Sequence, residues 1–380
     1  MKKAKKIKKI KILLNVLLIS MLIVIPNLLI SIQRDIEIPI EEKNPNISIN
    51  TRLPQESPVY YEDTWGQAWG IYVSGDYAYV ADGSAGLAVI DVSDPTNPGT
   101  PVYEDTTRLA WDVYVSGDYA YVANWDSGLA VIDVSDPTNP GTPIYEDTTG
   151  YARGVYVSGD YAYMADDSGL AIIDVSDPTN PGTPVYLYAT QWVCGVYVSG
   201  DYAYVADGSS GLAIIDVSDP TNPGTPVYTY TTGWVSGVYV SGDYAYVADW
   251  GSGLAIIDVS DPTNPGTPVY ENTTGFSRNV YVSGDYAYVA DGSSGLAVID
   301  VSDPTNPGTP IYEDTTDDAW DVYVSGDYAY VAAEDSGLAV IQVRRSGGAI
   351  PFELIIIASV IGGGAVIGVA VVILLRRKRK

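Results

Sequence analysis

The chain has 380 residues and a net charge of −27, with 32 Tyr and 8 Trp against 2 Phe, 38 Gly, 24 Pro, one Cys and no His. The lack of His excludes His-dependent catalytic triads and His metal ligands, and the single Cys194 excludes an internal disulfide framework. The aromatic and turn-forming residues favour an all-β fold.

Charge is distributed unevenly along the chain. Seven Lys lie within residues 1–11 and five Lys or Arg form residues 376–380, whereas residues 58–345 carry 41 Asp or Glu against five Arg, a net charge of −36. A surface this acidic repels a phosphate backbone, so no nucleic acid is expected as a partner.

The N-terminal part predicts a route to a membrane. Residues 1–11 form a basic segment that we expect to be cytoplasmic, and residues 12–32 are mostly apolar. This run exceeds the usual apolar core of a signal peptide, about 7–15 residues, so a retained signal anchor is favoured over a cleaved signal peptide, and both remain open. Residues 33–57, with Glu, Pro and Asn, predict an extended stalk.

A sevenfold repeat fills residues 58–343. Its most constant stretch is Val-Ser-Gly-Asp-Tyr-Ala-Tyr, and the Asp of each copy recurs at steps of 42, 42, 41, 42, 42 and 42 residues. These positions are Asp76, Asp118, Asp160, Asp201, Asp243, Asp285 and Asp327. A fixed period of this size predicts a solenoid or a propeller.

One repeat predicts four antiparallel strands. In the second repeat these are residues 111–117, 119–123, 128–134 and a strand that starts at 143–145, with a two-residue type II′ hairpin at Gly117-Asp118. Four strands in 42 residues match one blade of a β-propeller, in which neighbouring blades bury each other's faces.

The ends of the array predict how the ring closes. The array starts with a lone fourth strand at residues 58–60 and stops after a third strand that ends at Val343. The first strand is therefore expected to complete the last blade and to close a seven-bladed β-propeller without a free edge.

The run Gly128-Leu129-Ala130-Val131-Ile132-Asp133-Val134-Ser135-Asp136-Pro137 resembles the LVIVD-repeat family of β-propellers, which are often exported or membrane-bound. The resemblance covers residues 58–343. It implies the propeller fold, and it carries no catalytic residue set to this chain.

The C-terminal part predicts an integral membrane protein. Residues 344–353 are expected to be a linker, residues 354–375 a transmembrane helix and residues 376–380 a basic cytoplasmic tail. Both basic termini then stay in the cytoplasm and the propeller lies outside, at the cell membrane. Strand parity puts both propeller ends on one face, so the other face is expected to point away from the membrane.

The candidate binding residues share that outer face. All eight Trp lie either between a fourth strand and the next first strand or between a second and a third strand, and both kinds of loop open on one face. The candidates are Trp65, Trp69, Trp111, Trp125, Tyr151, Arg153, Trp192, Trp234, Trp250, Phe276, Arg278 and Trp320. Trp and Arg commonly anchor interfaces, which predicts contact with an extracellular protein or glycan ligand. The alternative is that these side chains pack between blades near the channel.

Carboxylates that suggest a metal site have structural explanations. Six third strands end in an Asp, and the seventh has Gln342, which favours a backbone hydrogen bond over an ion ligand. The six are Asp91, Asp133, Asp174, Asp216, Asp258 and Asp300. The turns at residues 82–84 and 207–209 are expected to be structural rather than calcium sites. Cys194 is expected to be a small filler, and no metal or other cofactor is predicted.

The sequence thus favours a membrane-anchored surface binding or adhesion module that is not an enzyme. A structural cell-envelope component is one alternative. A carboxylate-based hydrolase or lyase is another, because acids are plentiful, although no acid pair is distinguished by its place in the repeats.

Overall fold

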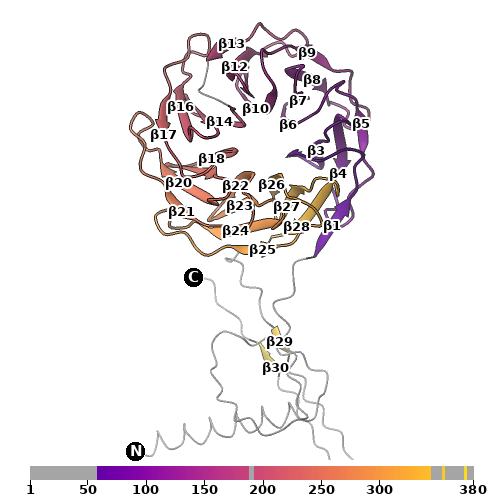
Figure 1. The fold of residues 1–380 in the computed structure, drawn as a ribbon. Helices are drawn as coiled ribbons and strands as arrows, with labels where there is room; N and C mark the ends of the chain where they lie inside the picture. The colour runs from indigo at the N-terminus through magenta and orange to yellow at the C-terminus, as the bar shows by residue number, and fades with distance from the viewer. Residues whose placement is uncertain (1–57, 188–191, 344–352, 356–371, 375–380) are drawn as a thin grey trace, which may run out of the picture. The chain divides into compact units, whose positions relative to one another are not determined.

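A computed structural model describes residues 58–187, 192–343, 353–355 and 372–374. The chain divides into two compact units, Ser57–Arg344 and a unit formed by Met1–Glu56 with Arg345–Lys380. In the first unit, seven antiparallel sheets of four strands each form a ring of blades (Figure 1). The predicted seven-bladed propeller is confirmed.

Each blade supplies one strand to each of four positions, counted outward from the centre of the ring. The first strands are β2 Gly70–Ser74, β6 Asp112–Ser116, β10 Ala152–Ser158, β14 Gly195–Ser199, β18 Gly237–Ser241, β22 Asn279–Ser283 and β26 Asp321–Ser325. The second strands are β3 Tyr77–Ala81, β7 Tyr119–Ala123, β11 Tyr161–Asp166, β15 Tyr202–Ala206, β19 Tyr244–Ala248, β23 Tyr286–Ala290 and β27 Tyr328–Ala332. The third strands are β4 Leu87–Asp91, β8 Leu129–Asp133, β12 Gly169–Asp174, β16 Leu212–Asp216, β20 Leu254–Asp258, β24 Leu296–Asp300 and β28 Leu338–Gln342. The fourth strands are β1 Val59–Glu62, β5 Val102–Glu104, β9 Ile144–Glu146, β13 Val185–Leu187, β17 Val227–Thr229, β21 Val269–Glu271 and β25 Ile311–Glu313.

The hairpin between first and second strands has the predicted geometry. Ser116 pairs with Tyr119, so Gly117 and Asp118 are the two loop residues. Gly117 has φ of 58°, whereas Asp118 is not among the residues with positive φ. Positive φ at the first loop residue alone is the requirement of a type II′ turn, which glycine meets without steric cost.

The hydrophobic core is divided among the spaces between neighbouring blades. In one such cluster, Leu87 and Val89 of β4 pack with Val113 of β6 and Val122 of β7. Seven clusters of this kind repeat around the ring. Each blade buries its faces only against its neighbours. The repeat of about 42 residues in the sequence therefore gives one apolar cluster for each pair of neighbouring blades.

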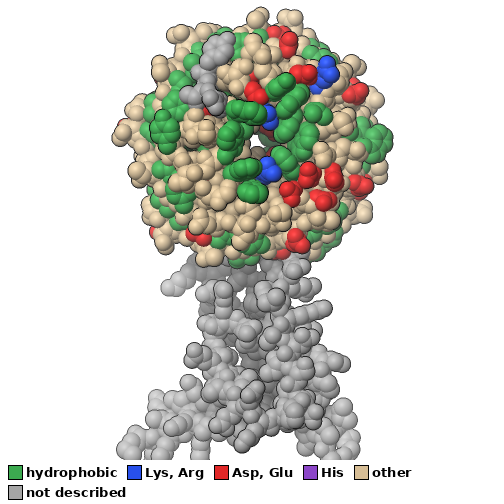
Figure 2. All heavy atoms as spheres, viewed as in Figure 1, with side chains coloured by type: hydrophobic (Ala, Val, Ile, Leu, Met, Phe, Trp, Pro, Cys, Tyr) green, Lys and Arg blue, Asp and Glu red, His purple; other side chains and the backbone are tan. Residues whose placement is uncertain are grey.

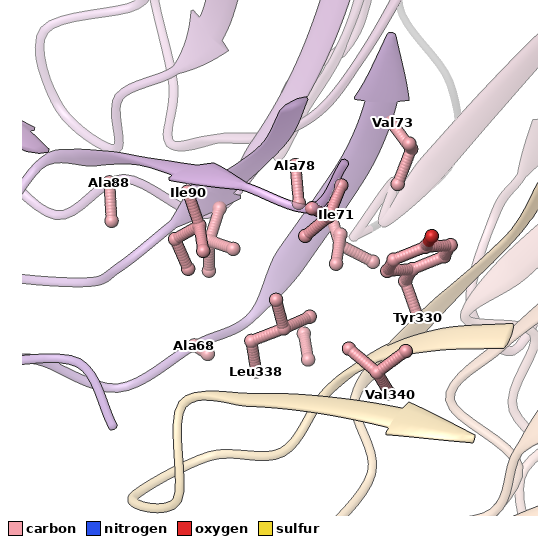
Figure 3. Close-up of a cluster of buried hydrophobic side chains, with 12 residues drawn as sticks. Ala68, Ile71, Val73, Ala78, Ala88, Ile90, Tyr330, Leu338 and Val340 are labelled. Atoms are coloured by element: carbon pink, nitrogen blue, oxygen red, sulfur yellow. The ribbon is translucent and has the colours of Figure 1, made fainter. Parts of the chain in front are cut away.

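The ring closes as predicted, through the N-terminal strand. β1 pairs antiparallel with β28, with Val59 opposite Ile341 and Glu62 opposite Leu338, which gives the sheet order β1-β28-β27-β26. Figure 3 shows the adjoining cluster, in which Ile71 and Ile90 of the first blade lie close to Leu338 and other side chains of the last.

The third blade departs from the regular pattern at one position. β10 is longer than the other first strands, and its pairing with β11 shifts register between Ala152 and Gly154, so that Arg153 forms a β-bulge. Between the paired residues Ala165 and Leu170 of this blade the chain has four residues, whereas it has five between the equivalent Ala81 and Leu87, which explains the single 41-residue step in the repeat. A bulge of this kind redirects the side chain that it carries.

In the second unit, the structure describes only two short strands. β29 (Glu353–Ile355) pairs antiparallel with β30 (Val372–Leu374). These residues belong to the linker and the transmembrane helix predicted from the sequence, and they are strands here. The rest of that helix, the stalk, the basic segments and residues 12–32 lie outside the described residues. The described residues include no helix long and apolar enough to cross a membrane.

Candidate functional site

The two kinds of Trp-bearing loop lie side by side on one face of the propeller. The N–H of Gly83, between β3 and β4, donates to the carbonyl of Ala110, between β5 and β6, at 3.2 Å. On the opposite face, the N–H of Val92 after β4 donates to the carbonyl of Asp76 in the first hairpin at 2.7 Å. The predicted separation of the two faces is therefore confirmed.

The first strands place residues of three successive layers around the channel, from that face inward. The outer layer is Trp69, Trp111, Arg153, Cys194, Ser236, Arg278 and Trp320. The next layer, which immediately follows each of these in sequence, is Gly70, Asp112, Gly154, Gly195, Gly237, Asn279 and Asp321. The third layer is Tyr72, Tyr114, Tyr156, Tyr197, Tyr239, Tyr281 and Tyr323. The residue type varies among repeats in the outer two layers and is constant in the third.

A cavity of about 550 Å³, here called the mouth pocket, occupies the outer part of the channel. Figure 2 shows hydrophobic and basic side chains gathered around the hollow in the middle of this face, with acidic side chains grouped to one side. Eight candidate residues line the mouth pocket: Trp69, Trp111, Arg153, Trp192, Trp234, Trp250, Arg278 and Trp320. Its volume lies within the usual range for small-ligand sites, about 300–1,000 Å³.

Aromatic rings stack along one side of the mouth pocket. Trp69 and Trp111 stack with ring centroids 4.3 Å apart, and Trp125 stacks on Trp111 at 5.1 Å. Tyr151 continues the row at 4.4 Å from Trp125. The bulged Arg153 places its guanidinium 4.8 Å from the Trp125 centroid. The alternative prediction is that these side chains pack near the channel. The stacked rings do pack there, because they cover one another's faces.

Two arginines differ in how their charge is balanced. The Nε of Arg153 donates to Asp167 Oδ1 at 2.6 Å. Arg278 lies 4.1 Å from the Trp320 centroid and 5.9 Å from that of Trp250, and it forms no ion pair with any described residue. Burial lowers the pKa of Arg278, which the more distant charges of Asp318 and Glu334 partly offset.

The inner end of the mouth pocket carries three polar side chains, here called the collar: Asp112, Asn279 and Asp321. Asp112 accepts a hydrogen bond from the N–H of the following residue, Val113, at 2.8 Å. It accepts a second from the N–H of Val155 in the next blade, at 2.9 Å. Asp321 likewise accepts from Ile71 N–H at 2.8 Å and from Asn279 Nδ2 at 2.5 Å. The collar thus ties neighbouring blades together.

Burial raises the pKa of both collar carboxyl groups. The pKa of Asp112 rises to about 6, and that of Asp321, which also feels the charge of Asp112, rises to about 8. The expectation that no acid pair is distinguished by its setting is therefore wrong. The sequence signal was present, because four repeats have Gly at this position. Gly70 leaves room for the neighbouring carboxylate, since a Cβ on Gly70 would lie 2.9 Å from Asp112 Oδ1.

Below the collar, seven tyrosines form a closed ring, here called the tyrosine ring. Neighbouring ring centroids lie 4.7–4.8 Å apart all the way round. Neighbouring hydroxyls hydrogen-bond to one another, and burial raises the pKa of five of them, those of Tyr72, Tyr156, Tyr197, Tyr281 and Tyr323, with that of Tyr72 raised to about 12. Seven centroids at the spacing of 4.7–4.8 Å lie on a circle of about 5.5 Å radius, part of which the rings themselves fill. The channel is therefore narrow at this level.

Four candidate residues do not line the mouth pocket. Trp125 and Tyr151 extend the stacked row, and Phe276 packs on Trp250 with centroids 4.9 Å apart at the rim. Trp65 lies elsewhere: it is 83% exposed and stacks on Tyr103 with centroids 4.3 Å apart. Arg108, also on this face, pairs with Asp126 at 3.1 Å in an exposed ion pair.

The carboxylates outside the channel have the structural roles expected. Asp133 accepts a hydrogen bond from Ser135 N–H at 2.9 Å, and bonds from Ser135 lower the pKa of Asp133. The other five Asp at the ends of third strands repeat this local bond. Asp82 lies buried and accepts from Thr64 Oγ1 at 2.7 Å. No group of three His, Cys, Asp or Glu side chains within the described ranges is placed to hold a metal ion.

Cys194 lies on the wall of the mouth pocket rather than among filler residues in the core. Its Sγ donates to the carbonyl of Trp192 at 3.4 Å, and burial raises the pKa of the thiol. A raised pKa keeps the thiol protonated, so nucleophilic chemistry is not favoured there.

The chain resembles known proteins in its repeats and in its fold. The model of the LVIVD repeat matches residues 65–101, 107–143, 149–184, 192–232, 232–268, 274–310 and 317–351. No curated protein matches the chain. The structure of U3-55K is similar at a TM-score of 0.62 and 10% identity, over 76% of this chain and 98% of that one.

Two further structures share the fold. The WD40 repeats of RRP9 match at a TM-score of 0.62 and 12% identity, over 76% of this chain and 98% of that one. The computationally designed Ika8 protein matches at a TM-score of 0.54 and 8% identity, over 76% and 100%. At such low identity these likenesses concern the fold alone. The seven repeat matches show that the chain belongs to the LVIVD repeat family, as one propeller with one repeat match in each of its seven blades.

Proposed function

We propose that this protein is a membrane-anchored binding or adhesion module whose propeller lies outside the cytoplasm and takes a protein or glycan ligand at the mouth pocket. The proposal is supported by the positions at which the residue type differs among the repeats. The tyrosine ring is the same in every blade, whereas the outer layer changes from Trp to Arg, Cys or Ser. Residues around the mouth pocket vary from blade to blade while the turns of the opposite face repeat, which is the pattern expected of a ligand-binding face on a constant scaffold.

The chemistry of the mouth pocket supports binding rather than catalysis. Trp and Arg are the side chains that most often dominate binding energy. The two collar carboxyl groups are the strongest feature in favour of a hydrolase. Each of their four oxygens already accepts a hydrogen bond from the backbone, and such bonds are the ties expected between blades.

The binding proposal is tested with the full-length protein on an array of glycans and a panel of cell-surface proteins. Trp192→Ala and Trp250→Ala remove half-exposed aromatic side chains at the mouth pocket. Trp65→Ala is the matched control, because it removes the same side chain from the same face outside the pocket. We expect the first two to weaken binding by about tenfold or more and the control to leave it unchanged. If all three bind as the wild type does, the pocket is not the ligand site, and a structural envelope role is favoured.

Orientation is tested separately with single thiol labels on intact cells, in a Cys194→Ser background. Ser209 lies in an exposed turn on the mouth-pocket face, and Asn139 lies in an exposed turn on the opposite face. Both chain ends of the propeller, near Val59 and Val343, lie on the Asn139 side. If the anchor follows Val343, the Ser209→Cys label reacts freely and the Asn139→Cys label reacts slowly. Equal or reversed rates contradict the orientation.

A further inference from the structure

The mouth pocket contains hydrogen-bond donors that have no acceptor within the described residues. Four buried nitrogen atoms there make no hydrogen bond: Nε1 of Trp69, Trp111 and Trp320, and Nε of Arg278. Their side chains lie together, because the Trp69 and Trp111 centroids are 4.3 Å apart and each is 6.2 Å from that of Trp320, over which Arg278 stacks. Buried donors without partners are uncommon in folded proteins. This side of the mouth pocket, here called the wall, therefore carries hydrogen-bond donors that have no acceptors in the described part of the chain.

The collar offers the complementary groups. The carboxyl and amide oxygens of Asp112, Asn279 and Asp321 have lone pairs beyond the bonds that they already accept. A ligand that satisfies wall and collar together has to accept hydrogen bonds at one position and donate them at another. Hydroxyl groups do both.

The charges around the mouth pocket disfavour a charged ligand. Arg153 is already paired with Asp167, and Arg278 is flanked by the charges of Asp318 and Glu334. With a net charge of −36 over residues 58–345, an anion is repelled. A cationic group finds aromatic faces that two guanidinium groups already occupy. An uncharged ligand avoids both conflicts.

The rim adds apolar surfaces of the right kind. Trp192 is 51% exposed and Trp250 is 40% exposed. Sugar rings present apolar C–H faces to aromatic rings and hydroxyl groups at their edges. Because the tyrosine ring narrows the channel below the collar, we expect a ligand chain to enter the mouth pocket end first.

We propose that the mouth pocket binds the terminal residue of a neutral glycan, with its ring against Trp192 or Trp250, its hydroxyl oxygens accepting from Arg278 and the indole N–H groups, and its hydroxyl protons donated to the collar. The inference rests on the proposed binding function and narrows it to one ligand class. The four donor atoms are buried, so this binding mode requires the indole rings and Arg278 to turn slightly toward the ligand.

The test is titration calorimetry on the full-length protein, with tryptophan fluorescence recorded in parallel. The probes are the methyl glycosides of glucose, galactose, mannose and N-acetylglucosamine, and neutral oligosaccharides that end in these sugars. Glucuronate and a set of acidic, basic and neutral peptides are the comparison ligands. We expect binding of at least one neutral sugar with a change in fluorescence, weakened about tenfold by Trp192→Ala or Trp250→Ala and by Asn279→Ala, and unaffected by Trp65→Ala.

Three results overturn the inference: no binding of any neutral sugar, binding of glucuronate alone, or sugar binding that none of the pocket variants weakens. A peptide that binds and is lost in Trp192→Ala or Trp250→Ala overturns the sugar class and leaves the binding function in place. If no ligand of any class responds to the pocket variants, both proposals fail. Thermal unfolding of each variant confirms that the protein is folded, and Asn279→Gln is a second collar variant that keeps the amide.

Discussion

Trp250 occupies a backbone position that other repeats give to glycine. Its φ is 45°, close to the 48° of Gly208 and the 54° of Gly292 at the same turn position. A left-handed conformation costs a residue with a side chain about 1–2 kcal/mol, a cost that glycine avoids. Trp125 shows the same feature, with φ of 48°. Glu334, with φ of 37°, holds the same turn position in the last blade, so the turn itself requires this conformation. The presence of Trp instead of glycine at two of these positions, in spite of the strain, is consistent with a binding role.

Trp250→Gly therefore separates stability from binding. The variant loses the packing on Phe276 but is relieved of backbone strain, so we expect the free energy of unfolding to change by less than about 1 kcal/mol. Binding of the ligand at the mouth pocket is expected to fall by about tenfold or more. Denaturant unfolding and the binding assay measure the two effects. A large loss of stability with unchanged binding indicates that Trp250 serves the fold.

The collar predicts a specific dependence of stability on pH. The folded-state pKa of Asp321 is raised to about 8 from its ordinary value near 4, so its contribution is complete at low pH and is lost as the pH rises through 8. Asp321→Asn cannot titrate. Between pH 4 and 9 we expect the stability of the variant, relative to the wild type, to rise by on the order of 2 kcal/mol.

The exposed carboxylates give the opposite sign. Hydrogen bonds from Ser135 lower the folded-state pKa of Asp133, so its contribution is present above the ordinary pKa and is lost as the pH falls through the lowered value. Relative to the wild type, Asp133→Asn is therefore expected to be less stable near neutral pH, and this difference should disappear in acid. Urea unfolding across the pH range compares both variants. A parallel response of the two contradicts the assignment.

At the scale of the strand, the repeated Tyr of each first strand forms a unit that no single blade contains. The Tyr239 ring packs in a tilted arrangement with its centroid 4.7 Å from that of Tyr197 and 4.8 Å from that of Tyr281, and the hydroxyl of Tyr239 hydrogen-bonds to those of both neighbours. Tyr239→Phe interrupts this series of hydrogen bonds and leaves neighbouring buried hydroxyls short of a partner, which costs about 1–3 kcal/mol. Tyr119→Phe, in a second strand, is the matched control, and we expect it to change stability by less than about 0.5 kcal/mol. Equal effects on thermal unfolding contradict a cooperative ring.

Strands and turns were predictable because each has a local signal. Alternation of side chains marks β6 and β7, and Gly117-Asp118 marks the turn between them. The tyrosine ring had no such signal, because a constant Tyr fits any half-buried strand and the repeat does not say which strand lines the channel. The collar was visible only as Asp112, Asn279 and Asp321 replacing Gly, and its meaning depends on the next blade. The partnerless donors of Trp69 and Trp111 arise from packing that spacing alone does not encode.

At the scale of the whole molecule, the two faces of the ring differ in how constant their residues are. One face carries the constant hairpins and Pro-rich turns, and both ends of the propeller chain lie there. The other face gathers the variable residues around the mouth pocket. A closed ring allows this division because every blade is held by its neighbours, so loops on one face can vary without loss of the core. The stability of the closed ring depends on the pairing of β1 with β28, here called the seam.

Proline substitution tests the pairing of β1 with β28. Tyr60 of β1 lies opposite Val340, and Ile144 of β9 lies opposite Val131, so the two residues occupy the same place in their blades. Proline at either position disturbs the pairing of a fourth strand. After Ile144→Pro the chain still runs from the second blade into the third. After Tyr60→Pro the last blade loses its only strand shared with the start of the ring, and the cluster of Ile71, Ile90 and Leu338 is left to hold the seam.

We therefore expect Tyr60→Pro to lower the free energy of unfolding by about 3 kcal/mol or more and Ile144→Pro to lower it by clearly less. Hydrogen exchange locates the effect: in Tyr60→Pro, protection should fall first in β28 and β2, on both sides of the seam, whereas in Ile144→Pro the loss should stay within β8. Equal destabilisation, or exchange confined to β28 in the first variant, would show that the apolar cluster closes the ring without the shared strand.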